Sequence, residues 1–177
     1  GASTGEIFFT SCGTESNNTI IRNAINAYGI KHAISSKIEH HAVLHPLQTL
    51  EQKGLIDLHY VDLDEKGQVN LQHLNELLSG IEDQAFVSLM HANNEIGNVL
   101  DIDAAGKICK EHKALFHSDT VQTVGHFTMN LSEINIDFIT GSAHKFHGPK
   151  GAGFMYINAD LKINPFIEGG AQERNMR

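Results

Sequence analysis

The sequence lacks any apolar run that approaches the ~20 residues needed to cross a bilayer. Its first residues, GASTGEIFF, have neither the basic start nor the long apolar core of a secretion signal. Cysteine is scarce, because only Cys12 and Cys109 are present, far apart and without a CxxC spacing, so a disulfide framework is not expected. These absences predict a soluble cytosolic protein with reduced thiols.

An excess of positive charge is also missing. The chain has 21 acidic and 13 basic residues, a net charge of −8 at pH 7, and no block of like charges. This balance argues against sequence-independent binding of nucleic acid or of an anionic membrane. A small molecule is therefore the favoured ligand.

Apolar residues are plentiful, at 41% of 177 residues, and they predict one domain that spans residues 1–177. Apolar runs without alternation are typical of strands buried on both faces of a parallel sheet. Helical spacing of apolar residues occurs between several runs, in residues 21–28, 71–78 and 102–109. The pattern predicts a doubly wound, mostly parallel α/β sheet with helices on both faces and a ligand crevice at the carboxyl ends of the strands. The predicted strands are EIFFTS, HAISS, AFVSLMHA, ALFHSD, DFITGSA and GAGFMYI.

Polar loops follow most of these runs, and each alone is most simply a solvated turn. The first, SCGTE, leads from a strand into an amphipathic helix. Backbone N–H groups near Gly13 and Thr14 would then face an anion such as a phosphate. Capping of the helix by Thr14 or Ser16 is the structural alternative.

Two further loops carry a carboxylate and a lysine. Asp119 follows the buried run ALFHSD, where an ionised carboxylate needs either a structural salt bridge or the protonated ring nitrogen of a cofactor. Lys145 follows DFIT and lies among Ser142 and His144 rather than carboxylates, which suits a Schiff-base lysine, although surface lysines are commoner. An anion site, a carboxylate for a pyridinium and a nucleophilic lysine are together what pyridoxal 5′-phosphate (PLP) requires.

Histidines gather in KIEHHAVLHPL, where His40 or His41 could lie over an aromatic ring. His41 and His45 also form an H-x-x-x-H pair, so a zinc site is an alternative. No carboxylate or cysteine stands at a matching ligand spacing, so we predict no metal site.

Together these motifs resemble the cysteine desulfurase family, PLP-dependent enzymes of the class V aminotransferase type. The resemblance covers the chain from about Glu6 onward. It implies the large PLP-binding domain of such enzymes, with a mostly parallel, seven-stranded sheet. The matching segments are FTSCGTESNN, SKIEHHAV, MHANNEIG, HSDTVQTVG, GSAHKFHGPKGAGFMYI and GGAQERNMR.

The resemblance also implies a role for each site residue. Lys145 would bind PLP covalently, Asp119 would pair with the pyridinium nitrogen, and His40 would stack on the ring as the second catalytic residue. Gln122 would donate to the phenolic oxygen, with Asn94 close to the same edge. The phosphate would be held by Gly13, Thr14, Ser142 and His144.

The activity that the resemblance implies converts L-cysteine to L-alanine and leaves the sulfur as a persulfide on an enzyme cysteine. The sulfur then passes to an acceptor such as an iron–sulfur scaffold or a tRNA-thiolation protein. A cytoplasmic homodimer is expected. Alternatives are a selenocysteine lyase, another class V PLP enzyme, or a non-catalytic structural fragment.

The resemblance further implies a longer protein, with an N-terminal arm and a small C-terminal domain that this sequence does not contain. The arginine for the substrate carboxylate and the persulfide cysteine are expected there, so we expect this core to be inactive alone. Cys109 lies on the apolar face of a predicted helix, and Cys12 stands where the family usually has glycine. Neither is expected to carry the persulfide.

Overall fold

The computed structural model describes residues 1–177. Its strands form one seven-stranded sheet in the order β1-β7-β6-β5-β4-β2-β3. The strands from β3 to β6 along this order are parallel, and β7 pairs antiparallel with both β6 and β1. The prediction of a mostly parallel, seven-stranded α/β sheet is confirmed. The strands are β1 (Ile7–Thr10), β2 (His32–Ser35), β3 (Asp57–Tyr60), β4 (Ala85–Ser88), β5 (Leu115–Asp119), β6 (Phe138–Ser142) and β7 (Gly153–Ile157).

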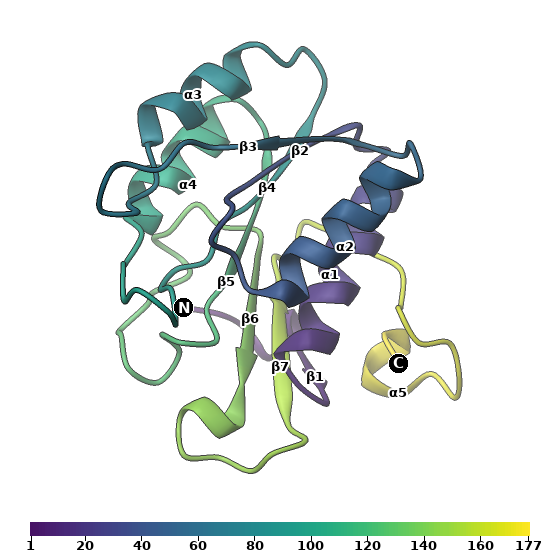
Figure 1. The fold of residues 1–177 in the computed structure, drawn as a ribbon. Coiled ribbons are helices and arrows are strands. Elements are labelled where there is room, and N and C mark those ends of the chain that lie inside the picture. Colours follow the sequence, from purple (N-terminus) through teal and green to yellow (C-terminus); the bar gives the residue numbers. More distant parts are fainter.

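Helices cover both faces of the sheet, with α1 and α2 on one face and α3 and α4 on the other (Figure 1). None of them has the length and apolar character that crossing a lipid bilayer requires. The helices are α1 (Gly13–Ala27), α2 (His41–Gln52), α3 (Leu71–Ser79), α4 (Ile102–Glu111) and α5 (Gln172–Asn175), with short 3-10 turns η1 (Thr4–Glu6) and η2 (Ala143–Lys145).

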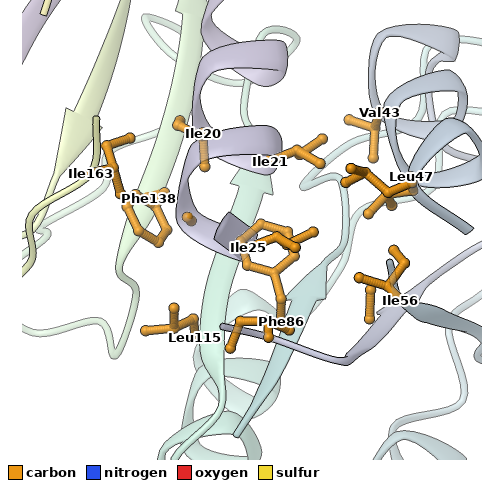
Figure 2. Close-up of a cluster of buried hydrophobic side chains, with 14 of the residues drawn as sticks. Ile20, Ile21, Ile25, Val43, Leu47, Ile56, Phe86, Leu115, Phe138 and Ile163 are labelled. Atoms are coloured by element: carbon orange, nitrogen blue, oxygen red, sulfur yellow. The ribbon is translucent and has the colours of Figure 1, made fainter. Parts of the chain in front are cut away.

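Each face of the sheet has its own hydrophobic core. Successive side chains of a strand point to opposite faces, so Phe86 of β4 joins the core under α1 and α2 while Val87 joins the core under α3 and α4. Figure 2 shows the first core, where Ile21 of α1 and Leu47 of α2 approach the sheet residue Phe86. Burial on both faces explains why the central strands appear in the sequence as unbroken apolar runs.

The outer elements differ from the predictions. EIFFTS was expected to be buried on both faces like a parallel strand, but β1 is an antiparallel edge strand whose Phe9 is 66% exposed. GAGFMYI forms β7, which is largely buried as expected but pairs antiparallel with both of its neighbours. β3 was not predicted, because this opposite edge strand is only partly buried and lacks a continuous apolar run. α2 was not predicted either, and it contains Pro46, which cannot donate a backbone hydrogen bond.

Candidate functional site

A cavity of about 290 Å³ lies at the carboxyl ends of the strands. Its lining comes from the segments that follow β1, β2, β4, β5 and β6. Every residue predicted for the site lines this cavity, although these residues lie up to 132 positions apart in the chain (145 − 13). The lining residues are Cys12, Gly13, Thr14, Asn17, His40, Ala42, Met90, Asn94, Asp119, Val121, Gln122, Ser142, His144 and Lys145.

The start of α1 forms one wall of the cavity. Side chains at the N-caps of α2, α3 and α4 accept hydrogen bonds from their helices, but the N-cap of α1, Cys12, makes no such bond. The structural alternative of a capped helix start is therefore wrong, and the first N–H groups of α1 lack a side-chain partner. A Cβ on Gly13 would lie 2.7 Å from Cγ2 of Val121, so glycine allows this close approach. Cys12 has a φ of −176°, an extended conformation open to any residue.

Asp119 forms the floor at the end of β5, and its side chain is buried. Oδ2 accepts a hydrogen bond of 2.7 Å from Nδ2 of Asn17, and Oδ1 accepts one of 3.0 Å from the backbone N–H of Val121. Burial raises the pKa of Asp119, while these hydrogen bonds oppose the rise. Asp119 forms no ion pair, so the structural salt bridge that was its alternative is absent.

Lys145 ends the turn η2 directly after β6, and its side chain is exposed. Its backbone carbonyl accepts a hydrogen bond of 2.9 Å from Nε2 of His126. This bond joins η2 to the segment that follows β5. Ser142 Oγ and His144 Nδ1, at the base of the same turn, lie 3.0 Å apart. Lys145 forms no salt bridge, which leaves its amine available to a ligand.

His40 is the N-cap of α2, and its Nδ1 accepts a hydrogen bond of 3.0 Å from the backbone N–H of Ala42. The neutral ring therefore carries its proton on Nε2, the nitrogen left to meet a ligand. Asn94 is exposed at the rim, where its Nδ2 donates to Oε1 of Glu95 at 2.6 Å. Gln122 is half-buried and makes no side-chain hydrogen bond within the chain, so its amide is free.

Sequence reasoning missed Asn17, which orients the central acid. Its Oδ1 accepts a hydrogen bond of 2.9 Å from Oγ1 of Thr140, and its Nδ2 donates to Asp119, so its amide joins β5 and β6. Asn17 is fully buried on the apolar face of α1, four positions before Ile21. A polar residue at that spacing was the signal that could have identified it.

The histidines outside the cavity do not form a metal site. The rings of His41 and His45 stack with centroids 4.8 Å apart on the outside of α2. No group of three or more His, Cys, Asp or Glu side chains in the structure is arranged to hold a metal ion.

The fold and cavity together define a doubly wound α/β domain with a lysine and a buried acid at the carboxyl end of its sheet. The chain belongs to the aminotransferase class-V family, whose sequence model matches residues 1–176. This match confirms the class V resemblance identified from the motifs.

Similar proteins include several cysteine desulfurases. The chain is 48% identical to the cysteine desulfurase IscS of Dictyoglomus turgidum, over all of this chain and 45% of that protein. It is 44% identical to the cysteine desulfurase IscS of Methanosarcina thermophila, over all of this chain and 44% of that protein. The chain thus spans about half the length of the curated relatives it matches.

Two solved structures show the same fold. A structure described as a NifS-like protein superposes with a TM-score of 0.94 at 41% identity, over 99% of this chain and 48% of the other. A structure described as SspA in complex with cysteine superposes with a TM-score of 0.92 at 33% identity, over 99% of this chain and 51% of the other.

Proposed function

We propose that residues 1–177 form a single PLP-binding domain, the cofactor-binding part of a cysteine desulfurase. The observation that carries the proposal is that one cavity contains Lys145, Asp119 and the uncapped start of α1. Because these groups come from distant parts of the chain, a common ligand is the simplest reason for their meeting.

The residues fit PLP at three points. Asp119 is a buried acid without a cationic partner, and a protonated ring nitrogen would supply one. The free N–H groups at the start of α1, with the Ser142 and His144 pair, suit a phosphate. Lys145 has an unpaired amine at the same cavity, where it would hold the aldehyde carbon.

When bound, PLP supplies an electron sink for the bonds at the substrate α-carbon. Asp119, fixed by Asn17 and Val121, would keep the ring nitrogen charged. His40 would lie over the ring and offer Nε2 for proton transfer, since Nδ1 is engaged in capping α2. The free amide of Gln122, with Asn94 nearby, would bind the phenolic oxygen.

We also propose the substrate and partners by similarity. Relatives at 43–48% identity are called cysteine desulfurases, and the SspA structure contains cysteine. L-cysteine is accordingly the proposed substrate, and a sulfur-acceptor protein for iron–sulfur cluster assembly or tRNA thiolation is the proposed partner. A cytoplasmic homodimer is the proposed state of the whole enzyme.

The test is a titration of the purified chain with PLP, followed by visible absorption. We expect a saturable band of lysine-bound cofactor that disappears in Lys145→Ala. Lys150→Ala, which removes an exposed lysine of the same loop, is the matched control and should keep the band. An equal band in Lys145→Ala would overturn the site. Formation of alanine from L-cysteine by the complete protein containing this chain tests the activity itself.

A further inference from the structure

Glu39 is a buried acid that the proposed chemistry does not use. It lies between β2 and α2, directly before His40, and it is 5% exposed. Its Oε1 accepts hydrogen bonds from the backbone N–H of Met90, at 2.8 Å, and from Oγ of Ser36, at 3.0 Å. Its Oε2 has no hydrogen-bond partner, and Glu39 forms no ion pair.

The contact with Met90 joins two segments of the cavity wall. Residues 36–40 follow β2 and carry His40, whereas residues 89–94 follow β4 and carry Asn94. β2 and β4 are neighbours in the sheet, but their pairing ends at Ser35 and Ser88. Beyond that point, backbone bonds tie the second segment to β5 instead, through Leu89 and His91. Side chains must therefore make the link between the two segments.

Asn93 makes a second link of this kind. Its Nδ2 donates to the backbone carbonyl of Ile38 at 2.6 Å. Its Oδ1 accepts from the backbone N–H groups of Glu95 and Ile96, at 2.8 Å and 3.0 Å, and so shapes the turn that carries Asn94. Glu39 and Asn93 are both buried. The side chain of Glu39 bonds from the first segment to the backbone of the second, and the side chain of Asn93 bonds from the second segment to the backbone of the first.

We propose that Glu39 is a positioning residue of the cofactor site, whose carboxyl group holds the His40 segment against the Met90–Asn94 segment. The inference rests on the proposed function, because it assigns Glu39 a part in building the PLP site. Residues on both sides of the link line the cavity, so loss of the link widens the space where the ring would lie.

Glu39 does this as a neutral acid. It is buried without a cation, and the charge of Asp119 further opposes its ionisation. Burial first, and Asp119 next, raise the pKa of Glu39 to about 8. The carbonyl oxygen of the neutral acid accepts both hydrogen bonds, and a glutamine at this position keeps such an oxygen at the same reach. Aspartate keeps the carboxyl group but is one methylene too short.

The experiment compares Glu39→Gln, Glu39→Asp and Glu39→Ala in the 177-residue chain. PLP affinity is measured by absorption titration, and exchange of the Met90 backbone amide is measured by hydrogen exchange without PLP. We expect Glu39→Gln to match the parent within about twofold, whereas the Asp and Ala variants bind PLP roughly tenfold more weakly and exchange Met90 roughly tenfold faster. Glu51→Gln, at an exposed acid of α2, is the control and should change neither.

A Gln variant as impaired as the Ala variant, or an Ala variant equal to the parent, would overturn the proposal. If Glu39→Ala does not fold, the Asp and Gln variants decide by the same criteria. If the parent binds no PLP, the proposed function fails, and Met90 exchange alone decides: fast exchange in Glu39→Asp but not in Glu39→Gln supports the link, and equal exchange contradicts it.

Discussion

The sheet has a cavity at each end, and the two differ in what their polar groups do. The larger, of about 610 Å³, lies where β5 and β6 begin, and the smaller, of about 290 Å³, lies where they end. Each holds an acid of raised pKa, Asp137 at the amino end and Asp119 at the carboxyl end, and burial is the main cause in both. A choice of the ligand site by cavity volume alone would therefore select the amino end of the sheet.

Some polar groups at the amino end are hydrogen-bonded within the chain. Asp137 accepts a hydrogen bond of 2.8 Å from the backbone N–H of Phe116, and Lys110 donates to Oδ1 of Asn135 at 3.0 Å. At the carboxyl end the start of α1 lacks a cap, whereas Asp119 and Lys145 there, like Asp137 and Lys110 at the amino end, lack partners of opposite charge. The uncapped start of α1 beside an acid and a lysine, rather than cavity size, therefore indicates the ligand site.

The largest expected difference between the ends is in pH dependence. Burial on folding raises the pKa of Glu39 from 4.5 to about 8, so its contribution to stability is complete below pH 4.5 and is lost as pH rises through about 8. Between these values the free energy of unfolding should fall by on the order of 5 kcal/mol more in the parent than in Glu39→Gln. Urea unfolding at several pH values measures this difference.

The half-buried Asp137 is the matched case at the amino end, since burial raises its pKa in the same direction. Asp137→Asn should reduce the pH dependence of the free energy of unfolding less than Glu39→Gln does, because Glu39 is the more buried of the two acids. Equal pH profiles for the parent and Glu39→Gln would mean that Glu39 is ionised in the folded protein.

The next effect concerns the two aspartates and PLP. Asp119→Asn removes the charge for the ring nitrogen and should weaken PLP binding roughly 10- to 100-fold, since a hydrogen bond to a charged group contributes about 1.5–3 kcal/mol. Asp137→Asn should leave PLP affinity unchanged, because it lies at the other end of the sheet. Absorption titration of both variants tests this, and equal losses would remove the distinction between the cavities.

The smallest effect concerns one glycine at each end. A Cβ on Gly13 would press on Cγ2 of the β-branched Val121 beside the predicted phosphate position, so Gly13→Ala should lower PLP affinity a few-fold and cost less stability than a clash with backbone does. A Cβ on Gly106 of α4 would clash with the backbone carbonyl of Asn135, which lines the amino-end cavity. Gly106→Ala should cost about 1–3 kcal/mol of stability and leave PLP affinity unchanged. A loss of PLP affinity in Gly106→Ala, together with unchanged PLP affinity in Gly13→Ala, would contradict this difference between the two ends.

The same contrast between regions explains what the sequence could predict. β4, β5 and β6 were predicted because they are buried on both faces, and the ligand crevice followed because parallel strands end at one edge. β3 was missed because its sequence, DLHY, has no continuous apolar run.

Within the site, positions after strands predicted the segments that face the cavity, with Asp119 and Lys145 among them, whereas the choice of Asn94 and Gln122 came from the family resemblance. Asn17 and Glu39 were not assigned a role, because each acts through a partner 102 or 51 positions away along the chain. A local pattern could mark Asn17 as a buried polar residue, but it could not identify the distant partner of either side chain.

The most direct test is to trap PLP on the chain with borohydride and to locate the modified lysine by mass spectrometry of its peptides. The account predicts that Lys145 carries the label at substoichiometric PLP, while Lys110 and Lys113 of the amino-end cavity remain unlabelled. Label on those lysines, or spread evenly over exposed lysines, would contradict a cofactor site at the carboxyl end of the sheet.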